Sequence, residues 1–271
     1  MCPRLFQIGP ITVYSFGLMM ALGFLAANYV LALDLKRRKL DTAIANNIIL
    51  IGLVAGIIGS KILYLIESWS EFLAHPFQEA FSPSGLTWYG GFVLATACIY
   101  WYSRRTKVGF KVISDATSPA LLLGYGIARL GCHFAGDGDY GFPTTLPWGT
   151  DYSKGTYPPS VAFRPFPEIT SKYPNGIVPD NTLCQPTPVY EFIICTILFA
   201  ILWKYRRSIK PDGAMFALYL ILAGAERFSI EFIRINPRIA WGLTEAQLIS
   251  IPMMLLGAFL LVYYKKIVKT T

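Results

Sequence analysis

The sequence contains few charged residues. They make up 15% of its 271 residues, whereas hydrophobic residues make up 54%. Soluble domains carry about a quarter charged residues, so this composition excludes an ordinary soluble domain and predicts a chain embedded in a bilayer. The five cysteines are not spaced as metal ligands, and no glycine-rich nucleotide loop is present. We therefore expect neither a metal nor a cofactor.

Other absences narrow the class of protein. No serine stands in a nucleophile elbow, which excludes the usual Ser-His-Asp hydrolases, and no internal repeat indicates a transporter. Met1–Ile11 lacks the residue succession of a cleaved signal peptide, so we expect the first apolar segment to stay in the mature protein. Cys132 and Cys184 approach one face of the membrane, where a disulfide is allowed. We expect free, mostly buried thiols instead.

Apolar segments of about 20 residues, the length that crosses a bilayer, recur along the chain. They predict an all-α integral membrane protein with about seven transmembrane helices in a single domain, residues 1–271. The expected spans are Val13–Leu33, Thr42–Ile66, Gly85–Tyr102, Val112–Phe134, Pro188–Trp203, Ala214–Ile235 and Thr244–Tyr264. Residues 135–187 lie between the fourth and fifth spans and are rich in proline and tyrosine. We expect them to form an irregular, turn-rich cap that faces outward.

Basic residues cluster after the first, third, fifth and seventh expected spans. The clusters are Lys36-Arg-Arg-Lys39, then Arg104, Arg105, Lys107 and Lys111, then Lys204, Arg206, Arg207 and Lys210, then Lys265, Lys266 and Lys269. Positive residues mark the cytoplasmic side, so we expect the N-terminus outside and the C-terminus in the cytoplasm. The net charge of +8 is then a topology signal and requires no nucleic-acid partner.

Arg129, Arg227 and Arg234 lie inside or at the ends of expected spans. An arginine in hydrocarbon is costly and usually has an anionic partner or a wet cavity beside it. Glu231 follows Arg227 by four residues and precedes Arg234 by three, so a helix would place them on one face. One interpretation is that these arginines snorkel to the interface or pair with Glu231 for structure. The interpretation that we favour is a cationic pocket for a phosphate-bearing lipid.

Polar residues from five expected spans lie near their outward ends. They are Lys61 and Tyr64, then Tyr89, Gly90 and Gly91, then Arg129, then Tyr190 and Glu191, then Arg227, Glu231 and Arg234. Polar groups at one depth suit a site for an outer-leaflet lipid headgroup, whereas an ion pathway would need them in both halves. Asp115 lies at the inward end, where we expect it to act with Ser114 as a helix N-cap.

Several short motifs occur in a specific order. They are Ile8-Gly-Pro-Ile11, Phe16-Gly-Leu-Met19, Gly59-Ser-Lys-Ile-Leu-Tyr64, Tyr89-Gly-Gly91, Arg129-Leu-Gly131, Gly136-Asp137, Pro186-Thr-Pro-Val-Tyr-Glu191, Arg227-Phe-Ser-Ile-Glu-Phe-Ile-Arg234 and Gln247-Leu-Ile-Ser-Ile-Pro252. Each motif is weak alone, but together they make nearly the whole chain resemble the prolipoprotein diacylglyceryl transferases. These are bacterial inner-membrane enzymes.

The resemblance implies a multi-pass inner-membrane enzyme that moves the diacylglyceryl group of phosphatidylglycerol to a cysteine thiol. The acceptor would be the signal peptide of an exported lipoprotein precursor, and the products a thioether and glycerol phosphate. Arg129 and Arg227 match the family's essential arginines, and Glu231 and Arg234 would hold Arg227 in place. The expected substrate-binding residues are Lys61, Tyr64, Gly90, Gly91, Asp137, Glu191, Glu231 and Arg234.

The departures from the family pattern concern proton-handling groups. Tyr89 stands where the family has a histidine that is a proposed base. Other departures are Tyr14, Phe16, Cys132, Ala135, Asp137, Ala223 and an extra residue near Gly138-Asp139. Two alternatives therefore stay open: a related lipid-modifying transferase with another acceptor, and a non-catalytic phospholipid-binding protein on the same scaffold.

His133 is a candidate for the missing catalytic base. It follows Arg129 by four residues, although a lone histidine at a helix end is more often structural. Tyr89 is the other candidate, but a phenol with a pKa of about 10 is a poor base unless a nearby arginine lowers that value. Asp137 and Asp139 could accept the proton, orient His133, or be solvated loop carboxylates.

Overall fold

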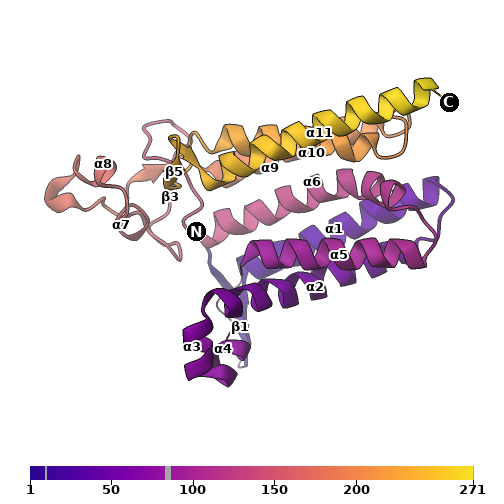
Figure 1. Cartoon of the computed structure of the whole chain (residues 1–271). Helices are drawn as coiled ribbons and strands as arrows, with labels where there is room; N and C mark the ends of the chain where they lie inside the picture. The colour runs from indigo at the N-terminus through magenta and orange to yellow at the C-terminus, as the bar shows by residue number, and fades with distance from the viewer. Residues whose placement is uncertain (10, 83–86, 271) are drawn as a thin grey trace. The chain divides into compact units, whose positions relative to one another are not determined.

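The computed structural model describes residues 1–9, 11–82 and 87–270, and most of them are helical (Figure 1). The chain forms two compact units. The first unit comprises Met1–Ala27 and Ser114–Thr271, and the second comprises Asn28–Ile113. Two helices, α1 (Ser15–Arg37) and α6 (Phe110–Ala135), contribute residues to both units.

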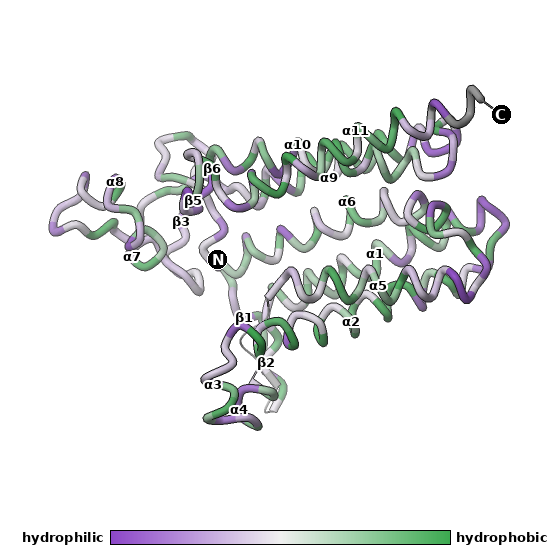
Figure 2. Tube along the Cα trace, in the orientation of Figure 1, coloured by the Kyte–Doolittle hydropathy of each residue, from purple (hydrophilic) through white to green (hydrophobic). Residues whose placement is uncertain are grey.

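A helix lies at each of the seven expected spans. The other five are α2 (Ala43–Glu67), α5 (Trp88–Arg105), α9 (Thr187–Tyr205), α10 (Ala214–Ile230) and α11 (Glu245–Thr270). The start of the expected span Gly85–Tyr102 lies outside the described residues. In the described part of the chain, α1, α2, α9 and α11 are long and apolar enough to cross a membrane. Figure 2 shows hydrophobic residues along these helices, consistent with a helical membrane protein.

The second unit is built on close contact between α2 and α5. A side-chain carbon at Gly90 would lie against the carbonyl of Gly59 and 2.6 Å from Cβ of Leu63, so only glycine permits this approach. At the far end of the pair, Asn47 Nδ2 donates to the hydroxyl of Tyr102 at 2.7 Å. Two short helices, α3 (Trp69–Ala74) and α4 (Pro76–Phe81), follow α2.

The first unit packs α10 against both α9 and α11. Its α1 and α6 approach closely at Gly23 and Gly124, where a side-chain carbon on Gly23 would lie 2.8 Å from the Gly124 carbonyl oxygen. Buried Leu122, Cys195, Leu202 and Met215 form a common apolar core.

Asp115 caps a helix, but not the one that the sequence indicated. Because α6 already begins at Phe110, neither Ser114 nor Asp115 lies at its N-terminus, and that part of the prediction was wrong. The buried Asp115 carboxylate instead accepts the backbone N–H groups of Gly213 at 2.8 Å and Phe216 at 2.9 Å. These groups belong to the start of α10, whose unpaired N–H groups need acceptors.

Residues 135–187 form a folded, turn-rich segment, as the proline content predicted. It contains β3 (Thr150–Asp151), α7 (Pro159–Ala162), α8 (Pro167–Thr170), the 3-10 turn η1 (Pro174–Gly176) and β4 (Leu183–Cys184). Its core consists mainly of Tyr140, Tyr152, Phe163, Phe166, Ile169, Val178 and Cys184. Cys132 and Cys184 are both buried and free, as expected. That the segment faces outward stays a prediction.

Two hairpins were not anticipated from the sequence. One pairs β1 (Arg4–Ile8) with β2 (Ile11–Tyr14), and the other pairs β5 (Arg238–Ala240) with β6 (Leu243–Thr244). The expected sixth span also ran too far, to Ile235, whereas α10 ends at Ile230. The chain turns there because Phe142 N donates to the Ile233 carbonyl at 3.1 Å and Gly141 pairs with Arg234.

Replacing Asp115 by alanine should destabilise the protein by roughly 1–3 kcal/mol, because two helix N–H groups lose their acceptor. Asp115→Asn keeps one acceptor oxygen and should cost less. Thermal unfolding in detergent, followed by circular dichroism, measures both. Glu71→Ala, which changes an exposed carboxylate in α3, is the control. An Asp115→Ala protein as stable as this control would contradict the capping role.

Candidate functional site

Charged side chains from three helices of the first unit form one cluster. Arg129 lies near the end of α6, Glu191 in the second turn of α9, and Arg227 near the end of α10. Arg234 follows α10, on the residues that pair with the 135–187 segment. The sequence predicted that polar residues of five spans lie at one depth. The structure brings four of these side chains into contact, and their common depth in a membrane stays a prediction.

Glu191 is the common acceptor of the cluster, and its side chain is fully buried. Its carboxylate receives Arg129 Nε at 2.5 Å and Arg227 Nη1 at 3.2 Å. It also receives Arg234 Nη1 at 3.3 Å and the Tyr125 hydroxyl at 3.0 Å. All three arginines that the sequence analysis identified therefore bind the same carboxylate, that of Glu191.

Asp139 forms a second bridge between arginines. It accepts Arg129 Nη1 at 2.5 Å and also pairs with Arg234 Nη2. Burial alone would raise the pKa of Asp139, but these two guanidinium groups outweigh that effect and lower it to about 2. Asp139 is therefore ionised at neutral pH, and the ion pairs exclude the interpretation of a fully solvated loop carboxylate.

Glu231 is the third carboxylate, and it pairs as its spacing predicted. It lies 2.7 Å from Arg227 Nη2 and 3.5 Å from Arg234 Nε. Asn236 Nδ2 donates to both of its oxygens at 2.9 Å, and the Thr244 hydroxyl donates at 2.7 Å. These contacts fix the carboxylate, which in turn orients Arg227.

The cluster balances three guanidinium groups against three carboxylates, yet not every guanidinium nitrogen has a hydrogen-bond partner among the described residues. Arg129 Nη2 is buried and has no hydrogen-bond partner within the described part of the chain. Arg227 is the most accessible arginine of the three, with 27% of its side chain exposed against 10% for Arg129 and 6% for Arg234. An incoming anion would therefore meet Arg227 first. The structure confirms that the arginines are paired with carboxylates, and a pocket for a phosphate-bearing lipid stays a prediction.

His133 points toward the 135–187 segment. Its Nδ1 lies 3.0 Å from the hydroxyl of buried Tyr152. Among the described residues, no hydrogen bond joins His133 to Asp137 or Asp139. Asp137 accepts the backbone N–H of Asp139 at 3.3 Å, and burial raises the pKa of the Asp137 carboxyl.

The remaining expected site residues belong to the second unit. Lys61 Nζ donates to the carbonyl and the hydroxyl of Ser82, both at 3.0 Å. The Tyr64 hydroxyl donates to Glu79 at 3.0 Å. Gly90 and Gly91 lie in the α2–α5 contact, which gives them a packing role. Tyr89 is partly exposed, and its ring lies edge-on to Trp88. Whether these residues share a site with the arginines stays a prediction.

Several members of the cluster were missed from the sequence. Tyr125 precedes Arg129 by four residues, a helical spacing that could have identified it. No sequence spacing indicated Asn236 or Thr244, because each reaches Glu231 only through the folding of a loop or a hairpin. Glu226 is also buried, with one oxygen unpartnered among the described residues.

Cys132, Asp137 and Asp139 lie close enough together to suggest a metal site, with potential ligand atoms within 4.8 Å of one another. Arg129 already donates to Cys132 Sγ at 3.3 Å and to Asp139. A guanidinium group thus already contacts two of the three potential ligands, and its positive charge would repel a metal cation. The donor set does not favour a metal ion.

Comparisons with known proteins identify the family of this chain. The family model described as prolipoprotein diacylglyceryl transferase matches residues 3–263. Relatives named phosphatidylglycerol–prolipoprotein diacylglyceryl transferase include one from Dehalococcoides mccartyi, 31% identical over 97% of this chain and 94% of its own. Another, from Clostridium tetani, is 30% identical over 96% of both chains. One from Leptospira interrogans is 28% identical over 93% of this chain and 89% of its own. The chain therefore belongs to the prolipoprotein diacylglyceryl transferase family.

Proposed function

We propose that the protein transfers the diacylglyceryl group of phosphatidylglycerol to the cysteine thiol of a lipoprotein precursor. Membership of the family and the names of its relatives support this reaction. The observation that carries it is the meeting of Arg129, Arg227 and Arg234 around buried Glu191. A preorganised set of guanidinium groups suits a phosphodiester whose negative charge grows during the reaction.

In the reaction, the cysteine sulfur attacks the glyceryl carbon that bears the phosphate. The carbon–sulfur bond forms as the carbon–oxygen bond breaks, and the electron pair of that bond moves onto the phosphate oxygen. Arg227, the most exposed of the three arginines, is the donor that this oxygen meets first. Arg129 Nη2 is buried and has no partner among the described residues, so it is a second donor behind Arg227. Glu191, Glu231 and Asp139 hold the guanidinium groups in position, so little reorganisation is needed when charge develops.

The thiol must also lose a proton. His133 can accept it at Nε2 if its Nδ1–H donates to the Tyr152 hydroxyl, which lies 3.0 Å away. Tyr89 is the alternative base, and Asp137, whose carboxyl pKa is raised by burial, is a further candidate. We assign the base to His133 because its partner Tyr152 is buried and fixes the ring.

The membrane arrangement is part of the same proposal. Seven helices would cross the bacterial inner membrane as a single domain, with the N-terminus and the 135–187 cap outside and the C-terminus in the cytoplasm. The signal peptide of the precursor would enter from the bilayer. Lys61, Tyr64, Gly90 and Gly91 would contribute to substrate binding from the second unit.

The test is to combine purified protein, phosphatidylglycerol and a peptide with a lipobox cysteine, and to measure the products by mass spectrometry. A peptide that gains a diacylglyceryl group supports the proposal. Lipid that is consumed without modification of the peptide indicates another acceptor. Lipid that is bound but unchanged indicates a non-catalytic binding protein.

Arg227→Ala and Arg129→Ala should abolish transfer, and Arg227→Lys should restore little of it. Charge-assisted hydrogen bonds contribute about 1.5–3 kcal/mol each, and lysine supplies the charge without the planar fork. We expect Arg227→Lys to lower kcat/KM by roughly 10–100-fold. Arg164→Lys, an exposed arginine of the 135–187 segment, is the matched control and should be near normal. Near-normal turnover of Arg227→Lys would remove the argument for a bidentate clamp.

His133→Gln should preserve lipid binding but slow transfer by about 10²–10⁴-fold, the usual contribution of a general base. The defect should shrink as pH rises toward the cysteine pKa of about 8.5, because the thiolate then forms without help. Tyr152→Phe should have a smaller defect, since it removes only the partner of the ring, and Tyr89→Phe should also be mild. Transfer rates of the wild-type protein and of the three variants, measured from pH 6 to pH 9, test these expectations. If Tyr89 is the base instead, the order of the His133 and Tyr89 defects reverses.

A further inference from the structure

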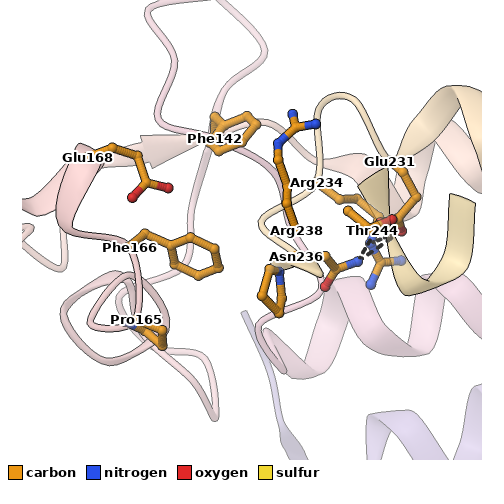
Figure 3. A pocket seen from close by; sticks show the side chains of 10 residues that line it. Phe142, Pro165, Phe166, Glu168, Glu231, Arg234, Asn236, Arg238 and Thr244 are labelled. Carbon is orange, nitrogen blue, oxygen red and sulfur yellow. Dashed lines mark hydrogen bonds and ion pairs between the residues drawn. The ribbon is translucent and has the colours of Figure 1, made fainter. Parts of the chain in front are cut away.

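A cavity of about 300 Å³ lies beside the arginine cluster, between the 135–187 segment and the loop from α10 to α11 (Figure 3). Its volume is at the lower end of the range for small-molecule sites, roughly 300–1,000 Å³. One wall is formed by Phe142, Phe166 and Glu168. The opposite wall is formed by Arg234, Asn236 and Arg238.

A smaller cavity of about 150 Å³ adjoins it and is lined by Arg227. The two cavities share Glu231 and Asn236 as lining residues. Glu231 is held in this shared wall by Asn236 and by Thr244. The accessible arginine of the cluster therefore lies next to the larger cavity, with one fixed carboxylate between them.

The larger cavity carries balanced charges and both kinds of hydrogen-bonding group. Arg238 is exposed and supplies guanidinium donors, whereas Glu168 is exposed and supplies carboxylate acceptors. Figure 3 shows Glu168 and Phe166 across the cavity from Asn236. The charge of Glu231 is already balanced by Arg227 and Arg234. Such a lining suits a small uncharged ligand with hydroxyl groups, which both donate and accept.

We propose that this cavity binds the terminal glycerol of a phosphoglycerol headgroup, and that Arg238 and Glu168 recognise its hydroxyls. This inference rests on the proposed function, in which the phosphate lies beside Arg227. The glycerol then extends past Glu231 into the larger cavity, where Phe142 and Phe166 cover its carbon atoms. The cavity thereby selects the lipid by the end of the headgroup that does not react.

The kinetic test compares phosphatidylglycerol with phosphatidylethanol, which has the same phosphodiester but no headgroup hydroxyl. The variants are Arg238→Gln and Glu168→Gln, with Arg164→Gln, an exposed arginine not among the lining residues, as control. We expect wild-type protein to prefer phosphatidylglycerol by about tenfold or more in kcat/KM, since each hydroxyl bonds to a charged group. Both variants should reduce this preference by raising KM for phosphatidylglycerol, with the phosphatidylethanol rate unchanged.

Arg238 also donates to the Gly242 carbonyl, so its substitution can disturb the β5–β6 hairpin. Glu168→Gln changes the opposite wall and leaves that hairpin intact. An equal loss of activity with both lipids, or an unchanged preference in both variants, would overturn the inference.

A binding measurement separates failure of this inference from failure of the proposed function. Calorimetry on the full chain in detergent compares soluble glycerol phosphate with inorganic phosphate. We expect wild-type protein to bind glycerol phosphate more tightly, and Arg238→Gln and Glu168→Gln to lose the difference. If neither lipid is transferred but this difference exists, the proposed function fails and the cavity assignment stands. Equal binding of the two soluble ligands by wild-type protein contradicts the assignment.

Discussion

The buried ion pairs of Glu191 determine the arrangement of the helix ends around them. A single carboxylate, fully removed from solvent, receives three arginines that come from α6, from α10 and from the residues after α10. Removing one partner of a buried ion pair usually costs about 3–5 kcal/mol, because the other charge is left uncompensated. Loss of any one of these arginines would therefore weaken the contact between the ends of these helices. The same ion pairs connect α6, α9 and the residues at and after the end of α10.

The sequence predicted the helices well because their signal is local. Seven apolar segments correspond to seven helices, and the proline-rich segment between the fourth and fifth is turn-rich. The pair Arg227–Glu231 was also predictable, because the residues are four apart on one helix. The end of α10 was not, because Ile233 is turned by pairing with Phe142, about ninety residues away in the chain.

The sequence predicted which residue types form the candidate site, but not which side chains contact one another. Arg129, Glu191, Arg227 and Arg234 stand out because charges are rare in apolar segments. Asp139 was considered only as a proton acceptor, a partner of His133 or a loop carboxylate. Its ion pairs with two arginines were not predictable, because they depend on a tight turn after α6, in which Gly136 and Gly138 have positive φ angles of 58° and 91°. The contact of His133 with Tyr152 could not be predicted either, because only the fold of the 135–187 segment brings Tyr152 to the imidazole ring. Long-range contacts of this kind depend on tertiary structure and leave no spacing pattern in the sequence.

The pairing of Gly141 with Arg234 couples two parts of the protein mechanically. It joins the start of the 135–187 segment to the same residue whose guanidinium binds Glu191 and Asp139. A displacement of the segment that breaks this pairing also pulls on Arg234 and, through it, on both carboxylates. The position of the segment and the geometry of the Arg234 ion pairs therefore depend on each other. A backbone contact far from the carboxylates thus contributes to how precisely the guanidinium group is placed.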